Sequence, residues 1–127
     1  GGTAPALLAL APGAATHGKI SFSAFADEGI CDALVRQQRV EHLLLCGIET
    51  PICVYQTAIA ALAEGLQVTL LSDCIGARHP EDSAACLVAL RAAGVHVLPS
   101  ETIYYSLLRD VRHPFFKPYT QLVKSHA

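Results

Sequence analysis

Three short apolar segments alternate with two longer helical patterns between residues 40 and 98, and this order restricts the fold more than any other feature. The apolar segments are residues 40–47, 68–73 and 95–98, each too short for a helix with its own buried face. Residues 50–64 and 80–93 have helical patterns, and a glycine ends each of them. The order strand, helix, strand, helix, strand predicts crossover connections and a parallel sheet covered on both faces, so the fold class is α/β.

The flanking segments have weaker patterns. We expect helix over residues 101–110 and again after Pro118, covering an edge of the sheet or a partner subunit. Residues 5–10 predict a short helix, and residues 15–20 a short strand. No linker or internal repeat divides the chain, so residues 1–127 are predicted to form one domain.

Composition excludes several classes of partner. The chain is 52% hydrophobic and 16% charged, which indicates extensive buried surface and suits a homo-oligomer. Nine Lys and Arg residues against eleven Asp and Glu residues provide no basic stripe for nucleic acid. No apolar run approaches the roughly 20 residues of a membrane span, and residues 1–15 lack the positive start of a signal peptide. We therefore expect a soluble, cytoplasmic protein that binds neither nucleic acid nor membranes.

The five cysteines are odd in number and form no C-x-x-C pair, which favours a reducing compartment over a disulfide framework. Cys31, Cys46 and Cys86 fall in predicted helices or strands and are interpreted as packing residues. Cys74 follows the second predicted strand and is a weaker candidate for chemistry. The six histidines show no metal-binding spacing, so neither a metal nor another cofactor is predicted.

Cys53 occupies the position best suited to a nucleophile. In an open parallel sheet, ligands collect where strands lead into helix N-termini, and residues 46–53 form such a turn. With Thr50 as N-cap and Pro51 in the first helical position, Cys53 is third, within the positive end of the helix. This position favours a thiolate, and unpaired backbone N–H groups there could hold an oxyanion. The alternative is a small core residue.

A thiolate also needs a positive neighbour, and Lys19 is a candidate. Lys19 stands among small and apolar residues in the sequence HGKISFSAF, which is unusual for a surface lysine. The alternative is a solvated charge at a strand end.

Two motifs relate the chain to a known family. Lys19 precedes the run Phe22-Ser23-Ala24-Phe25, and residues 47–58 (GIETPICVYQTA) fit the pattern G-x-x-T-x-x-C-V-x-x-T-A. Shorter matches are residues 65–68, Ser72-Asp73, residues 94–102 and residues 113–117. The chain thus resembles the isochorismatase-like cysteine hydrolases, which include nicotinamidases and N-carbamoyl amidohydrolases. Its tail is most similar to isochorismatase-domain proteins without a settled substrate.

The resemblance implies a role for each motif. Cys53 is the expected nucleophile and Lys19 the cation that supports its thiolate. The backbone N–H groups of Glu49 and Cys53 match the oxyanion hole, and the peptide bond between Ile48 and Glu49 matches a cis bond in the family. The implied fold has three layers, α/β/α, around a parallel, Rossmann-like sheet of six strands.

Phe25 and Tyr55 are weaker site candidates. Either aromatic side chain could line a substrate pocket, and packing in the core is the alternative for both.

The chain also departs from the family pattern. The family's catalytic aspartate precedes the lysine, whereas Asp27 and Asp32 follow Lys19 and match no such motif. The family's first two strands have no counterpart either. We expect the natural protein to continue upstream by roughly 50 residues, to the size of an ordinary domain.

Two functions follow. The first is a hydrolase that acts on a small amide, carbamoyl or related substrate through a covalent acyl-cysteine intermediate. The second, motivated by the missing aspartate, is a non-catalytic family member that binds a ligand or assembles an oligomer.

Overall fold

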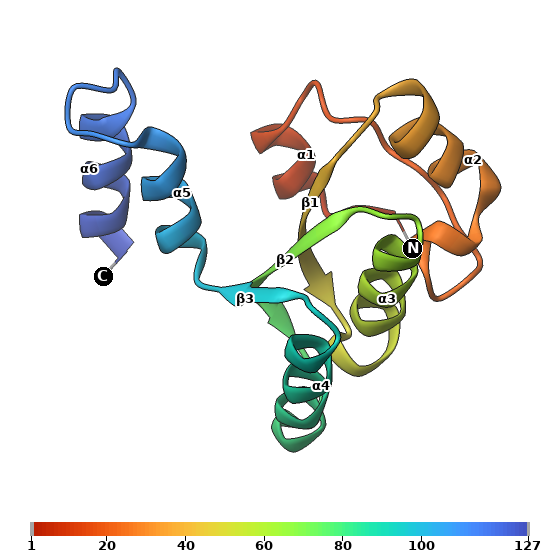
Figure 1. Ribbon diagram of the computed structural model, residues 1–127. Helices are drawn as coiled ribbons and strands as arrows, with labels where there is room; N and C mark the ends of the chain where they lie inside the picture. Colours follow the sequence, from red (N-terminus) through yellow and green to blue (C-terminus); the bar gives the residue numbers. More distant parts are fainter. Residues whose placement is uncertain (1, 127) are drawn as a thin grey trace.

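The computed structural model describes residues 2–126, and its centre is a sheet of three parallel strands (Figure 1). The strands are β1 (His42–Ile48), β2 (Gln67–Gly76) and β3 (His96–Leu98), in the spatial order β1-β2-β3. Both neighbouring pairs are parallel. The predicted α/β class and its three strands are confirmed.

Two helices connect the strands, as the sequence pattern predicts. They are α3 (Tyr55–Ala63) and α4 (Pro80–Ala92). Helix α4 has acidic residues in its first turn and Arg91 in its last, matching the polarity of the helix dipole. Gly65 and Gly94 follow the two helices with φ angles of +82° and +100°, a backbone conformation that glycine adopts without steric cost.

The hydrophobic core lies between α3, α4 and one face of the sheet. Val68 and Leu70 of β2, Ala58 and Ala61 of α3, and Leu90 of α4 are buried in one cluster. Successive right-handed crossovers in one direction place their helices on the same face of a sheet. The alanines keep the surface of α3 small, which lets that helix approach the strands closely.

The opposite face of the sheet is covered less closely, as the burial of β1 shows. Residues of β1 alternate between half-buried and exposed, and the exposed set is His42, Leu44, Cys46 and Ile48. A cavity of about 380 Å³ is lined by His42 and Leu44 of β1 and by residues of helix α5 (Ser100–Leu108). The interpretation of Cys46 as a packing residue is therefore wrong, since its side chain is exposed on the face of β1 that the core does not cover.

The N-terminal part consists of short helical segments joined by loops. They are α1 (Pro5–Leu10), η1 (Ala24–Ala26), α2 (Glu28–Cys31) and η2 (Asp32–Gln37). The predicted helix over residues 5–10 is confirmed. The predicted strand over residues 15–20 is wrong, because this segment is exposed throughout and pairs with no strand of the described chain.

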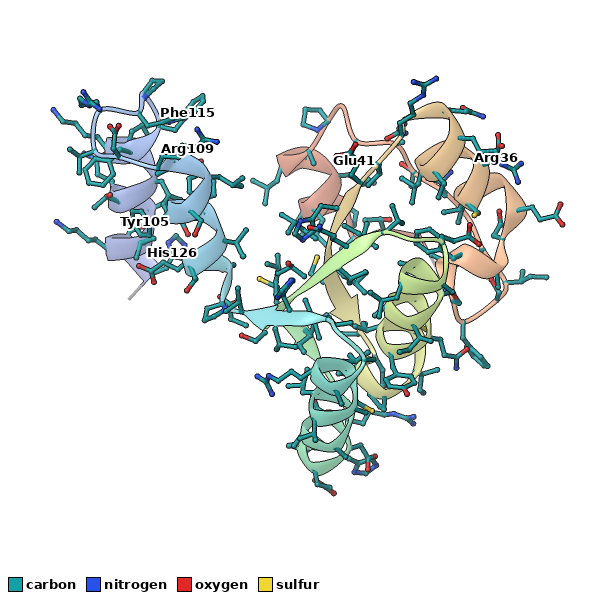
Figure 2. All side chains as sticks on the ribbon, in the orientation of Figure 1. Arg36, Glu41, Tyr105, Arg109, Phe115 and His126 are labelled. Atoms are coloured by element: carbon teal, nitrogen blue, oxygen red, sulfur yellow. The ribbon has the colours of Figure 1, made fainter. Side chains whose placement is uncertain are left out.

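The C-terminal part is a hairpin of α5 and α6 (Phe116–His126), at one side of the molecule in Figure 1. The ring of Tyr104 stacks on that of Tyr119, with 3.6 Å between centroids. The Tyr105 hydroxyl, on the hairpin in Figure 2, lies 3.2 Å from the Thr120 hydroxyl. Both predicted helices of the tail are confirmed. Within residues 2–126, no helix has the length and apolarity required to cross a membrane.

Candidate active site

The loop that follows β1 has an unusual backbone. Gly47 has a φ angle of +124°, and the peptide bond between the two residues that follow it, Ile48 and Glu49, is cis. This is the position at which the family resemblance implies a cis bond. The chain then enters a π-helical turn, η3 (Thr50–Val54), that leads into α3.

The helical segment begins one residue earlier than the sequence predicts. Glu49 is the N-cap, its carbonyl accepting hydrogen bonds from the N–H groups of Ile52 and Val54, each at 3.1 Å. Thr50 therefore occupies the first helical position and Cys53 the fourth. The prediction of Thr50 as N-cap is wrong, because the Glu49 carbonyl accepts the first helical hydrogen bonds and the Thr50 hydroxyl donates outside the helix.

Thr50 joins the loop to the end of the neighbouring strand. Its side chain is fully buried, and its hydroxyl donates a 3.0 Å hydrogen bond to the Gly76 carbonyl at the end of β2. The pairing of Ile48 with Gly76 brings the two strand ends together at the same level. The threonine of the T-x-x-C motif thus holds the turn that carries Cys53.

The structure brings Cys53 and Lys19 to the same cavity. This cavity has a volume of about 210 Å³ and lies at the carboxyl end of β1. Its lining comes from the loop around residue 19, the end of β1 and the first turns after it: Lys19, Ala24, Leu45, Cys46, Gly47, Ile48, Cys53, Val54 and Thr57. None of these lining residues carries a carboxylate.

Hydrogen bonds hold Lys19 and its loop in place. The Lys19 Nζ donates to the carbonyls of Ser21 and Phe22, at 2.8 and 2.9 Å. The N–H of Ala24 donates to the Thr57 hydroxyl of α3 at 3.0 Å, which ties the loop to the helix after Cys53. The two predicted site segments are therefore linked by a contact between Ala24 and Thr57.

Phe25 and Tyr55 lie outside the lining of this cavity. Phe25 is 8% exposed and belongs to the core cluster, and Tyr55 is half-buried and packs against it. The structure therefore favours the alternative of core packing for both residues.

Asp27 and Asp32 have local structural contacts. Asp27 caps α2, its carboxylate accepting a 3.1 Å hydrogen bond from the N–H of Ile30. The Asp32 carboxylate accepts hydrogen bonds from Gln37 and Arg36, and these lower its pKa. Arg36 itself lies on the outer side of the molecule (Figure 2). Neither aspartate lines the cavity that holds Cys53.

Sequence reasoning missed the contact that fixes the side chain of Glu49. The Arg78 guanidinium forms an ion pair with the Glu49 carboxylate at 2.8 Å, between the loop after β2 and the loop after β1. Arg78 belongs to no motif, so only the paired ends of β1 and β2 could have indicated it.

Asp73 and Cys74 lie near the end of β2. The Asp73 carboxylate accepts hydrogen bonds from the Ser100 hydroxyl at 2.6 Å and from the Ser100 N–H at 2.7 Å, which lower the pKa of Asp73. Cys74 is exposed and does not line the cavity with Lys19. Within residues 2–126, no group of three or more His, Cys, Asp or Glu side chains is placed to hold a metal ion.

A comparison with protein families matches residues 5–102 to the isochorismatase domain. Among curated proteins, the chain is 35% identical over 88 residues to isochorismatase domain-containing protein 2A of Mus musculus. That alignment covers 69% of this chain and 43% of the mouse protein. The chain spans about half the length of the curated relatives that it matches.

Solved structures show the same fold. The MAR1 ribonuclease of Caenorhabditis elegans superposes with a TM-score of 0.74 at 30% identity, over 83% of this chain and 53% of that one. The pyrazinamidase of Pyrococcus horikoshii, solved in complex with zinc, gives a TM-score of 0.57 at 31% identity, over 68% of this chain and 48% of that one.

Proposed function

Because the chain belongs to the isochorismatase family, we propose that Cys53 is the nucleophile of a hydrolase that acts on a small amide, carbamoyl or related carbonyl substrate. The observation that supports this most is the shared cavity, about 210 Å³ in volume, which Lys19 and Cys53 both line although they come from distant segments of the chain. Pyrazinamidase, one of the similar structures, is by its name an amide hydrolase.

The proposed chemistry assigns one role to each group. The Lys19 ammonium stabilises the Cys53 thiolate, and the thiolate sulfur attacks the substrate carbonyl carbon. The backbone N–H groups of Glu49 and Cys53 donate to the oxyanion as it forms. The carbon–nitrogen bond then breaks, the amine leaves with a proton, and water hydrolyses the thioester to restore the thiol.

The proton acceptor is the part of the site that these residues do not supply. The cavity lining holds no carboxylate, and the resemblance places the family's catalytic aspartate before the lysine. We propose that residues 2–126 provide the nucleophile and its cation, and that an aspartate from a longer chain completes the turnover.

The first test is the pH dependence of iodoacetamide labelling at each cysteine. Cleavage after Glu41, Glu49, Glu64 and Glu81 places Cys46, Cys53 and Cys74 in separate peptides, so mass spectrometry can follow each one. We expect Cys53 to be labelled faster than the other four cysteines at neutral pH, because a neighbouring positive charge favours the reactive thiolate. Labelling of Cys53 no faster than that of half-buried Cys86 would contradict an activated thiolate.

A substitution of the cation tests its role. We expect Lys19→Met to slow the labelling of Cys53 at neutral pH about tenfold, because the thiolate loses its positive neighbour. Lys124→Met, on exposed α6, is the matched control and leaves the rate unchanged. Equal rates in the two variants would remove Lys19 from the proposal.

Turnover is tested on a panel of small primary amides and carbamoyl compounds, with the longest natural form of the protein. Cys53→Ala is expected to abolish hydrolysis while the circular dichroism spectrum is retained. Hydrolysis that survives this substitution would rule out the cysteine mechanism.

A binding role is the second candidate, and the absence of a carboxylate from the cavity lining favours it. It predicts that iodoacetamide labels Cys53 no faster than the other cysteines, and that a small carbonyl compound binds saturably. The net charge of −2 does not favour a basic surface for RNA. We therefore propose no ribonuclease activity from the similarity to the MAR1 ribonuclease.

A further inference from the structure

Two cysteines lie next to each other where the β1–β2 ladder is irregular. The register shifts between Leu45 and Gly47, and pairing resumes with Gly47 opposite Ile75. Cys46 and Cys74 are the residues immediately before that pair. Cys46 lies within the irregular part, where residues 71–74 of β2 stand against this one residue of β1. Because Cys46 and Cys74 are each joined directly to a member of the Gly47–Ile75 pair, they lie on adjacent strands beside a paired position.

The expected spacing suits a covalent link. Adjacent strands lie about 4.8 Å apart, and the α-carbons of a disulfide are usually separated by about 4.4 to 6.8 Å. Side chains of β1 alternate between the two faces of the sheet, so the Cys46 thiol leaves the sheet on the face opposite to that of Gly47. On β1, this is the face of His42 and Leu44, which the hydrophobic core does not cover.

The thiols are also accessible and influence each other. Cys46 and Cys74 are both exposed, whereas Cys31, Cys53 and Cys86 are half-buried. Burial raises the pKa of the Cys74 thiol, and the negative charges of Asp73 and of a Cys46 thiolate add to this rise. An effect of the Cys46 charge on Cys74 requires the two sulfur atoms to be near each other.

We propose that Cys46 and Cys74 are a thiol pair that oxidises to a reversible disulfide between β1 and β2. The bond would cross the register shift and link the two strands directly before the Gly47 loop. Because Cys46 also lines the cavity that holds Lys19 and Cys53, the oxidised form would change one wall of that cavity. The inference does not require Cys53 to be a nucleophile.

A small disulfide such as oxidised glutathione supplies the oxidising equivalents. The Cys46 thiolate attacks one glutathione sulfur, forms a mixed disulfide and releases a first glutathione thiolate. The Cys74 thiolate then attacks the Cys46 sulfur and releases the second glutathione. Two protein thiols become one disulfide, one oxidised glutathione becomes two molecules of reduced glutathione, and these carry the two protons.

The test is peptide mapping after incubation of the folded chain with oxidised glutathione. Free thiols are blocked, and the chain is cleaved after its glutamates without reduction. We expect residues 42–49 joined to residues 65–81, with a mass two hydrogens below the sum of the two peptides. The linked species should run as a monomer on a denaturing, non-reducing gel. It should form at least tenfold more in the folded chain than in urea.

Substitutions identify the pair. The linked peptide should be lost in Cys46→Ser and in Cys74→Ser and should persist in the matched control Cys86→Ser. Three results would overturn the proposal: mixed disulfides at Cys46 and Cys74 without a link, a link between residues 42–49 and the Cys53 peptide, or a link that forms equally in urea. Since none of these readouts measures turnover, they separate this inference from the proposed hydrolase.

Discussion

The hydroxyl of Thr50 in η3 is a buried polar group whose hydrogen-bond partner lies on β2. Its hydrogen bond to the Gly76 carbonyl fixes the start of η3 against the end of β2. We expect Thr50→Val to lower the free energy of unfolding by about 1–2 kcal/mol, because a buried acceptor loses its donor. Urea denaturation measures this loss. Thr50→Ser, which keeps the hydroxyl, should recover part of the stability, and a valine variant as stable as the parent would contradict the role.

Backbone conformation, and not lack of space, requires glycine at residue 47. A β-carbon there would meet no atom within 4 Å. At a φ angle of +124°, an L-residue is strained. We expect Gly47→Ala to destabilise the fold by about 1–2 kcal/mol and to slow the labelling of Cys53. Gly18→Ala is the matched control, since that glycine has equally open surroundings and no positive φ. Similar unfolding curves for the two variants would show that residue 47 tolerates a side chain.

The sequence motifs predicted that Cys53 and Lys19 share a site, and both residues line one cavity, while their chemical roles stay predictions. The burial of Thr50 and the ion pair between Glu49 and Arg78 could not be predicted. Both depend on contacts between residues that are far apart in the sequence. The π-helical turn also moved Cys53 from the third to the fourth helical position, and no local pattern distinguishes this turn from a regular helix start.

Helix α5 is held at its N-terminus by a side chain from another element. Asp73 of β2 accepts hydrogen bonds from the hydroxyl and N–H of Ser100, the first residue of α5. These bonds lower the pKa of Asp73 in the folded state. The stabilisation is therefore complete above the ordinary aspartate pKa of about 4 and is lost as the pH falls below it.

We expect hydrogen exchange in α5 to accelerate below about pH 4, after correction for the intrinsic exchange rate. Asp73→Asn should weaken the attachment of the helix by about 1 kcal/mol, as for other losses of a helix-capping side chain, and should abolish the acid step. Exchange measured by mass spectrometry tests both effects. Asp82→Asn, in the first turn of α4, is the control, and an acid step that survives in Asp73→Asn would assign it to another group.

Elements with strong periodicity were predictable, and those set by neighbours were not. The three strands, α3 and α4 follow the apolar runs and glycine stops, whereas α5 and α6 were expected from weaker patterns, and all of these predictions are confirmed. The strand expected over residues 15–20 has the composition of a strand but no partner in the described chain, and backbone pairing decides whether a strand forms. The exposure of Cys46 could not be predicted either, because a sequence does not state which face of a strand other elements cover.

Apolar side chains remain exposed on the face of the sheet next to α5. Leu44 of β1 is 45% exposed and Leu107 of α5 is 65% exposed, and both line the cavity of about 380 Å³ between the two elements. An unpaired apolar edge strand favours association through β-pairing. We expect this chain to form dimers or larger species in sedimentation velocity at micromolar concentration.

The substitution Leu44→Lys should shift this chain toward the monomer, because a lysine on an edge strand discourages pairing. Val88→Lys is the matched control, on an exposed position of α4 far along the chain from β1. A compact monomer for the unsubstituted chain at all concentrations would exclude self-association through β1.

The aromatic residues of the hairpin have a consequence for spectroscopy. The chain contains no tryptophan and four tyrosines, and three of these, Tyr104, Tyr105 and Tyr119, lie in α5 and α6. Tyrosine fluorescence and near-ultraviolet dichroism will therefore report chiefly on the hairpin, while far-ultraviolet dichroism reports on all helices and strands. Melting curves from the two probes will coincide only where the hairpin and the sheet unfold as one cooperative unit.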